Sequence, residues 1–178
     1  MSLIDQSPPW RRYLSANAYY RWLAERGSLT RRIRRRCPYF FSVRAVRYDA
    51  GKAGRGEARQ MGVRAGGPAR RREVYLYCGD TPVVFAFSLL PMRSLCGRWR
   101  NLRQLGAKPL GERLFTNPQV RRAPLRFKTL TRRHALYRRA ARILSDPPPR
   151  LWARRSVFRF HDRPILVTEV FLPGILDL

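Results

Sequence analysis

The sequence predicts a single α+β domain over residues 1–178, in which several antiparallel strands form a sheet with helices on one side. Its 178 residues suit one domain and are enough to bury a hydrophobic core. Hydrophobic residues make up 44% of the chain and aromatic residues 12%, which argues against disorder. Runs rich in β-branched and aromatic residues alternate with turn signals and with segments of helical periodicity, and this mixture is typical of the α+β class.

Two helices are expected near the N-terminus, after an irregular lead-in over residues 1–14. From about Ser15 onward, apolar residues recur at helical spacing. Gly27 interrupts this pattern and can end the first helix, and Ser28 can cap a second helix that begins at Leu29. The second helix carries several arginines, which we interpret as a solvated basic face.

The middle of the chain predicts three strands. Tyr39–Tyr48 is rich in aromatic and β-branched residues, as strands are. Residues 49–70 hold many glycines and arginines and almost no large apolar residue, so we expect a mobile surface loop. Arg71–Cys78 alternates as a strand, Gly79-Asp80 can form a turn, and the apolar run Val83–Leu90 returns as a central strand.

Residues 116–150 form the least typical segment, which we interpret as a basic insertion. A strand is expected at Leu125–Leu130 and a helix at about 131–144, where apolar residues form a stripe on an otherwise basic surface. Such a helix usually covers a sheet, but it could also lie on an anionic membrane.

The last hairpin, Ala153–Leu172, places a carboxylate among apolar residues. Two β-rich runs are joined by a tight His-Asp-Arg-Pro connection, as in two antiparallel strands. Strand alternation puts Glu169 on the same face as Ile165, Val167 and Phe171. A buried carboxylate needs a cation, hydrogen-bond donors or its proton, because an isolated buried charge is very costly.

A second charge lies on a mostly apolar face of an earlier strand. Arg72 alternates in step with Val74, Leu76 and Cys78. Arg72 and Glu169 could form a structural ion pair, or one of them could be a strand end in water. Alternatively, the two line a buried pocket for a small anionic ligand, in which the arginine binds a carboxylate.

The charge of the chain is extreme. Lysine and arginine number 38 against 11 acidic residues, which gives a net charge of +27. Arginine dominates, since lysine occurs only at positions 52, 108 and 128. Such a chain attracts polyanions non-specifically, whether nucleic acid or anionic lipid, and it favours the capture of a small dianion.

Three widely spaced cysteines, at positions 37, 78 and 96, fit a reducing compartment better than a disulfide framework. With two histidines and no CxxC motif, a zinc site is not expected. The N-terminal stretch lacks the apolar core of a signal peptide, and no apolar run is long enough to span a bilayer as a helix. We therefore expect a cytoplasmic protein.

Four stretches occur in the order and spacing of a known family. They are WLAERGSLTRRI at 22–33, RREVYLYCGDTPVVFAFSLLP at 71–91, LGAKPLGERLF at 105–115, and WARRSVFRF followed by PILVTEVFLP within 152–173. In these motifs the chain resembles bacterial chorismate lyases. The resemblance implies a six-stranded antiparallel sheet with helices on one side and a small buried site closed by helical flaps. It also implies an enzyme without metal or cofactor that converts chorismate to 4-hydroxybenzoate and pyruvate, the first committed step towards ubiquinone.

The resemblance assigns four residues to the site. The family's ligand-binding arginine falls on Arg72, and the glutamate of its Thr-Glu motif falls on Glu169, so these two are expected to be catalytic and to bind substrate and product. Leu110 in the Pro-Leu-Gly motif and Leu29 after Ser28 are expected to contact the ligand. Leucine at position 29 departs from the methionine that is frequent in the family, a change that a backbone contact would tolerate.

The chemistry suggests a role for each charged residue. Arg72 would bind a carboxylate bidentately. Glu169 would hydrogen-bond the ring hydroxyl and act as general base or acid. Alternatively, a proton moves within the substrate to the enolpyruvyl methylene, and the protein supplies pose and electrostatics. Arg154 and Arg155 are candidates for the second carboxylate of chorismate; exposed arginines at the start of a strand are the alternative.

Two other function classes stay open. One is a non-catalytic ligand-binding module, because effector domains of some bacterial transcription regulators share this fold, although they normally follow a DNA-binding winged helix. The other is a nucleic-acid-binding protein, which charge alone suggests. We expect a monomer that binds chorismate and 4-hydroxybenzoate, recognises no specific nucleic acid and associates at most weakly with anionic membranes.

Overall fold

One antiparallel sheet organises the chain in the computed structural model, which describes residues 9–13, 15–96, 99–100, 102 and 110–178. The strand order is β1-β2-β3-β7-β6-β4, and β5 also pairs with β6. The strands are β1 Phe41–Lys52, β2 Pro68–Cys78, β3 Thr81–Pro91, β4 Val120–Arg122, β5 Arg126–Thr131, β6 Arg150–Phe160 and β7 Arg163–Phe171. The α+β class is confirmed, and the sheet in the described residues has seven strands rather than six.

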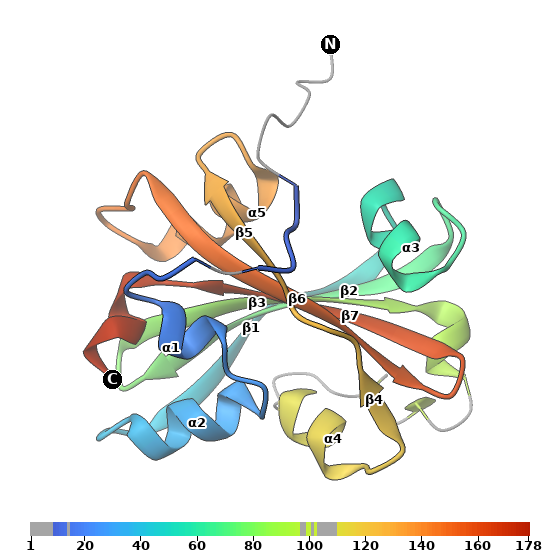
Figure 1. Cartoon of the computed structure of the whole chain (residues 1–178), viewed down its shortest axis with the longest axis horizontal. Coiled ribbons are helices and arrows are strands. Elements are labelled where there is room, and N and C mark those ends of the chain that lie inside the picture. Colours follow the sequence, from blue (N-terminus) through green and yellow to red (C-terminus); the bar gives the residue numbers. More distant parts are fainter. Residues whose placement is uncertain (1–8, 14, 97–98, 101, 103–109) are drawn as a thin grey trace.

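Short helices pack on both faces of this sheet, so the expectation of helices on one side is wrong in that detail. Helices α1, α2 and α4 lie on one face, and α3 and α5 lie on the other (Figure 1). Their bounds are α1 Tyr20–Leu23, α2 Leu29–Arg36, α3 Arg55–Met61, α4 Leu110–Thr116 and α5 Ala135–Ala140, with 3-10 turns at Met92–Leu95, Ala141–Ile143 and Pro173–Asp177. Among the described residues, no helix is long and apolar enough to cross a membrane.

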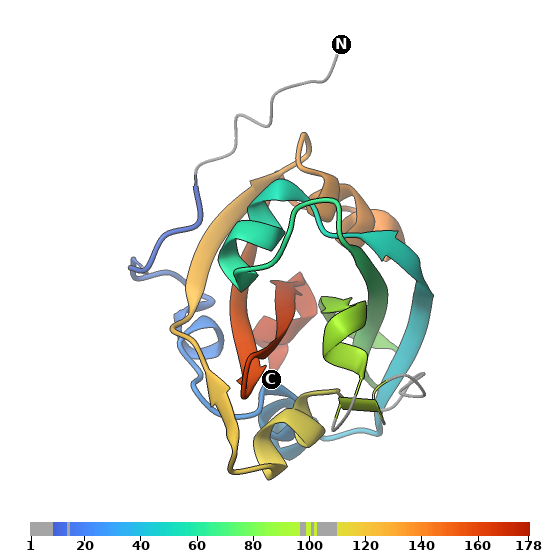
Figure 2. The same ribbon diagram turned by 90° about the vertical axis from the view of Figure 1, so that its right-hand side faces the viewer.

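Helices on both faces follow from strands that are apolar on both faces. In β2, Val74 and Leu76 pack into one buried cluster with Leu29, while Tyr75 packs into another on the opposite side. The Tyr75 hydroxyl donates a hydrogen bond to the carbonyl of Arg139 in α5, at 2.6 Å. The sheet is strongly curved (Figure 2).

The N-terminal prediction holds best at the second helix. Helix α2 begins at Leu29, and the hydroxyl of Ser28 accepts a hydrogen bond from the backbone N–H of Arg31, at 3.3 Å. The first helix, α1, is shorter than expected, since it includes only Tyr20–Leu23. Of the predicted lead-in, the described part includes Arg11, which forms an isolated β-bridge with Phe127, so it is tied to β5.

Residues 49–70 are not a loop without regular structure. Strand β1 continues to Lys52, α3 follows, and β2 begins at Pro68. Ala58 and Met61 of α3 are almost completely buried in the core, and Gly62 ends the helix in the left-handed conformation with a φ of 68°. The helix was missed in the sequence because glycine and arginine dominate this segment. Its two core residues, Ala58 and Met61, hold it on the sheet.

The basic segment 116–150 contributes part of the sheet. Strands β4 and β5 both pair with β6, and α5 follows them. Of the predicted apolar stripe, Leu136 and Ala140 are buried and pack into the core together with Tyr137, whereas Ala135 and Ile143 are exposed. Helix α5 therefore covers the sheet, and its apolar face is not free to lie on a membrane.

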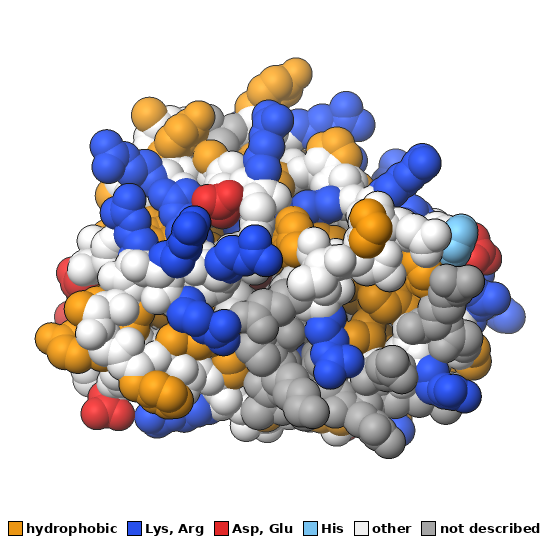
Figure 3. Space-filling view, turned by 90° about the horizontal axis from the view of Figure 1, so that it is seen from below, with side chains coloured by type: hydrophobic (Ala, Val, Ile, Leu, Met, Phe, Trp, Pro, Cys, Tyr) orange, Lys and Arg blue, Asp and Glu red, His pale blue; other side chains and the backbone are white. Residues whose placement is uncertain are grey.

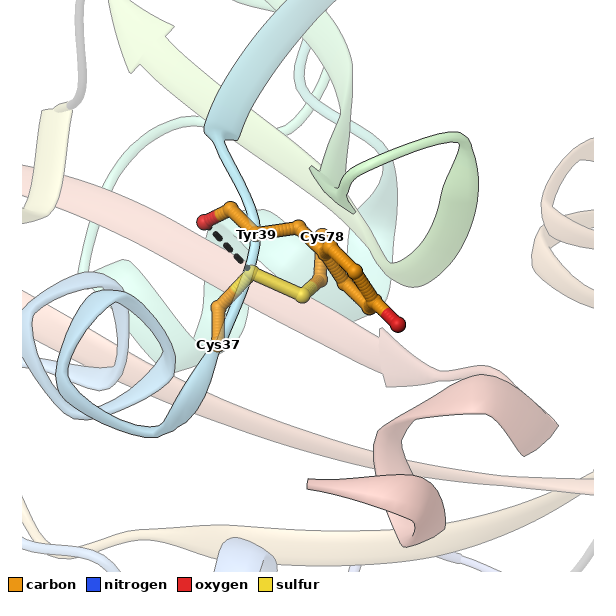
Figure 4. The surroundings of a disulfide bond; sticks show 3 residues. All are labelled: Cys37, Tyr39 and Cys78. Carbon is orange, nitrogen blue, oxygen red and sulfur yellow. Dashed lines mark hydrogen bonds between the residues drawn. A yellow bond between two sulfur atoms is a disulfide. The ribbon is translucent and has the colours of Figure 1, made fainter.

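The cysteines also differ from expectation. Cys37 follows α2, Cys78 ends β2, and the two form a disulfide beside Tyr39 (Figure 4). The pair is separated by 41 residues, so the sequence did not reveal that β1–β2 pairing, with Phe41 opposite Cys78, brings them together. Cys96 is exposed and is not part of this disulfide. The bond ties the end of α2 to the end of the strand that carries Arg72.

Candidate active site

A cavity lies between the sheet and the helices α2 and α4. All four residues that the sequence assigned to the site, Leu29, Arg72, Leu110 and Glu169, line it. The other lining residues are Thr30, Val43, Val74, Leu76, Ala86, Ser88, Gly111, Leu114, Phe115, Arg122, Phe158 and Val167. The wall is therefore mostly apolar, with a few charged groups.

Strand register explains how Arg72 and Glu169 meet at this cavity. Strand β3 lies between β2 and β7; its Ser88 is opposite Arg72, and its Ala86 is opposite Glu169. Because side chains two residues apart on a strand share a face, both charged side chains leave the same face of the sheet. Neighbouring strands lie about 4.8 Å apart, so β2 and β7, which carry Arg72 and Glu169, are separated by about 10 Å.

Glu169 forms its ion pair with Arg154. The Nε of Arg154 donates a hydrogen bond to Oε2 of Glu169 at 2.6 Å, and the two residues are directly opposite each other in the β6–β7 hairpin. The side chain of Arg154 is 1% exposed and that of Glu169 is 17% exposed. The ion-pair partner of Glu169 is thus Arg154 of the neighbouring strand β6, rather than Arg72 as the sequence had suggested.

Arg154 also holds the segment between α1 and α2. Its Nη1 donates to the backbone carbonyls of Trp22, Leu23 and Glu25, at 3.1, 3.1 and 2.6 Å. Carbonyls at the end of a helix lack partners within the helix, and a cation there is favourable. Its Nη2 is buried and has no hydrogen-bond partner among the described residues, but Arg154 is not one of the residues that line the cavity, which speaks against its predicted role as a binding group for the second carboxylate.

Arg155 is excluded from the cavity by strand alternation. It points to the opposite face of the sheet, where it donates to Oε1 of Gln60 at 3.0 Å and lies 3.6 Å from the ring centre of Trp10. Burial lowers the pKa of Arg155 to about 9. Because Arg155 lies on the face of the sheet away from the cavity, the prediction that it binds a substrate carboxylate is wrong.

Arg72 is 2% exposed. Burial lowers its pKa to about 10, which leaves the guanidinium cationic at neutral pH. Sequence reasoning missed a second cavity arginine, Arg122 of β4, because nothing distinguishes it from the many arginines around it. Burial lowers the pKa of Arg122 to about 10 as well, against the opposing effect of the Glu169 charge.

Leu29 and Leu110 are the first residues of α2 and α4. The first backbone N–H groups of a helix have no partner inside the helix, so both helix starts offer donors at the cavity wall. The two helices approach closely: a Cβ on Gly111 would lie 3.3 Å from Oγ1 of Thr30. Glycine at position 111 therefore permits this contact between the two walls.

The described residues contain no group of three His, Cys, Asp or Glu side chains that could hold a metal ion. The cavity instead combines arginines, one carboxylate and helix N-termini. This arrangement can bind a small ring that carries a carboxylate at one end and a hydroxyl at the other.

Comparisons with known proteins agree on one family. A family model described as "Chorismate lyase" matches residues 11–177. The probable chorismate pyruvate-lyase of Nitrosospira multiformis is 54% identical over 157 residues, which cover 88% of this chain and 87% of that protein. The probable chorismate pyruvate-lyase of Methylobacillus flagellatus is 40% identical over 168 residues, which cover 94% of each chain.

Solved structures with a similar fold come from transcription regulators. The effector domain of PhnF from Mycobacterium smegmatis aligns with a TM-score of 0.63 at 17% identity, over 83% of this chain and 90% of that one. The ligand-binding domain of a putative GntR-family regulator from Bordetella bronchiseptica aligns with a TM-score of 0.55 at 19% identity, over 75% and 85%. At such low identity these matches support the fold alone.

Proposed function

The chain belongs to the chorismate lyase family, and we propose that its cavity converts chorismate to 4-hydroxybenzoate and pyruvate, for ubiquinone biosynthesis. The observation that carries this proposal is the meeting of Arg72 and Glu169 on one face of the sheet, between the N-termini of α2 and α4. Family membership gives the reaction, and the cavity gives residues that suit it.

The two charged residues match the two ends of the aromatic product. Arg72 binds the ring carboxylate, for which its fork of donors is suited. Glu169 accepts a hydrogen bond from the ring hydroxyl at the other end. Leu29 and Leu110 contribute backbone N–H groups at the starts of their helices. The apolar lining residues contact the ring between these groups.

The reaction breaks the bond between the ring and the ether oxygen of the enolpyruvyl group. A proton leaves the ring carbon that bears the hydroxyl, the ring becomes aromatic, and the enolpyruvyl methylene gains a proton to become the methyl group of pyruvate. Glu169 acts on this proton transfer, either as the base that removes the ring proton or by holding the hydroxyl while the proton moves within the substrate. Its ion pair with Arg154 fixes the carboxylate in position.

We expect the purified protein to form 4-hydroxybenzoate from chorismate without added metal and in the presence of a chelator, because arginines and a carboxylate supply the chemistry. Absorbance of 4-hydroxybenzoate measures the reaction, and lactate dehydrogenase with NADH measures pyruvate independently. Activity that disappears on chelation and returns with a divalent ion would contradict the proposed mechanism.

The second candidate function is a ligand-binding module without catalysis, because the same cavity of arginines, one carboxylate and apolar residues would suit binding alone. The same experiment separates the two. Such a module would bind 4-hydroxybenzoate, and its melting temperature would rise with the ligand, but chorismate would remain unchanged.

A cytoplasmic location is part of the proposal, and it bears on the Cys37–Cys78 bond. Disulfides are rare in reducing compartments, so a cytoplasmic protein would meet conditions that favour the two thiols. Alkylation of thiols in intact cells, followed by mass spectrometry of the peptides, tests this. A pair that is fully oxidised in the cell would argue against the cytoplasm.

The basic surface of this proposed monomer gives only weak, unselective association with nucleic acid and anionic membranes. Lysine and arginine side chains are spread over the face that carries α2 and α4 (Figure 3), and the net charge is +27. We expect binding to DNA and to phosphatidylglycerol vesicles that falls steeply with salt, because it arises from charge neutralisation. A complex with one nucleic-acid sequence that persists at high salt would overturn this.

A further inference from the structure

The substrate carries a carboxylate that the aromatic product lacks. In the proposed reaction chorismate has a ring carboxylate and an enolpyruvyl carboxylate, and 4-hydroxybenzoate keeps only the first. Arg72 accounts for the ring carboxylate. Neither Arg154 nor Arg155 lines the cavity, since Arg154 is held against Glu169 and the α1–α2 segment and Arg155 lies on the opposite face.

Arg122 of β4 is the remaining arginine in the cavity wall. Its guanidinium lies 5.4 Å from the ring centre of Phe115 and 5.1 Å from that of Phe158. Its Nη1 donates to the carbonyl of Arg26 at 2.7 Å. These contacts hold the cation against two aromatic rings and fix its orientation.

The hydrogen-bonding capacity of this cation is incompletely used. Its Nε is buried and has no hydrogen-bond partner among the described residues. Arg122 also forms no salt bridge with a carboxylate within the part of the chain that the structure describes. A buried donor without a partner is costly. A ligand carboxylate would relieve this cost and would pair with the cationic guanidinium.

We propose that Arg122 forms a carboxylate-binding subsite that takes the enolpyruvyl carboxylate of the substrate. The inference rests on the proposed function and deepens it. Arg72 then recognises the part that stays with the ring, and Arg122 recognises the part that leaves as pyruvate. The site thereby binds the dianionic substrate through one more charge-assisted contact than the monoanionic aromatic product.

The position of Arg122 also gives the leaving acid a route. Besides the cavity, Arg122 lines an outward groove together with Arg12, Tyr13, Tyr20 and Arg26. Arg12, Tyr13 and Arg26 are exposed, so this groove is basic and faces solvent. Pyruvate bound to Arg122 therefore lies at the boundary between the cavity and the groove, and it can leave without crossing the ring site.

The test compares substrate and product binding in Arg122→Gln, Arg122→Lys and Arg72→Gln. For Arg122→Gln we expect kcat/KM for chorismate to fall by about 10- to 100-fold, as for the loss of a charged hydrogen bond. The Kd for 4-hydroxybenzoate, measured by calorimetry, should change by less than about 2-fold. Inhibition by pyruvate should weaken in parallel with kcat/KM. Arg72→Gln should weaken the binding of both chorismate and 4-hydroxybenzoate.

Arg121→Gln is the matched control, because Arg121 is an exposed neighbour on the same strand and should leave all three quantities unchanged. Arg122→Lys keeps the charge and should recover part of the loss, and it serves as the main variant if Arg122→Gln does not fold. An equal loss of 4-hydroxybenzoate and chorismate binding, or an unchanged kcat/KM, would overturn the subsite. A wild-type protein without turnover would instead refute the proposed function, whatever the Arg122 variants bind.

Discussion

Glu169→Gln is expected to reduce kcat/KM for chorismate by about 100- to 10,000-fold, the usual contribution of a positioned acid or base. Glutamine keeps the shape of the side chain and can still accept the hydrogen bond from Arg154, but it cannot take a proton from the substrate. The fold should persist, because Arg154 keeps its three backbone carbonyl partners. Turnover and thermal melts with and without 4-hydroxybenzoate measure both effects.

The chain offers a matched control in Glu73→Gln. Glu73 is also buried in a central strand and forms an ion pair, with Arg139, but it lies on the opposite face of the sheet. We expect this substitution to lower stability and leave kcat/KM per folded molecule unchanged. If Glu169→Gln behaved in the same way, Glu169 would be a structural residue and the catalytic assignment would be wrong.

Arg154→Met is expected to lower the free energy of unfolding by about 3–5 kcal/mol, the usual effect of breaking a buried ion pair from one side. Methionine fills much of the space but leaves the Glu169 carboxylate without its cation. The carbonyls of Trp22, Leu23 and Glu25 also lose a shared donor. Urea denaturation followed by circular dichroism measures the loss.

A double-mutant cycle with Glu169→Gln isolates the pair. The loss in the double variant should be smaller than the sum of the two single losses, because the second substitution removes a charge that the first left unpaired. If the free energy of unfolding of Arg154→Met were within about 1 kcal/mol of the wild-type value, the contacts of Arg154 with Glu169 and the α1–α2 segment would not stabilise the fold as expected.

Strand alternation in the sequence was enough to place Arg72 and Glu169 on inward faces, since a period of two leaves only two choices. The partner of Glu169 was also within reach. His161 and Asp162 form a two-residue turn that pairs Phe160 with Arg163, and this register sets Arg154 opposite Glu169. Reading the turn length, in addition to the alternation, would have identified the ion pair.

Arg122 was beyond such reasoning. Strand β4 has three residues, too few for alternation to define a face, and it lies in a segment crowded with arginines. Helix α3 and the Cys37–Cys78 bond were missed for a related reason, because both depend on tertiary contacts between segments distant in the sequence. Local patterns predict elements; they do not predict which distant elements meet.

The strand order has a consequence for synthesis of the protein. Strand β3 is complete at Pro91, but its neighbour on one side is β7, which begins at Arg163. Until the last strands leave the ribosome, the nascent chain exposes the unpaired edge of an apolar strand, a surface that can pair with other chains. The two charged residues proposed for catalysis are divided in the same way, since Arg72 is synthesised well before Glu169. An N-terminal fragment that ends before β7 lacks Glu169 and cannot form the complete candidate site, because the sheet that carries it closes only when β7 pairs with β3.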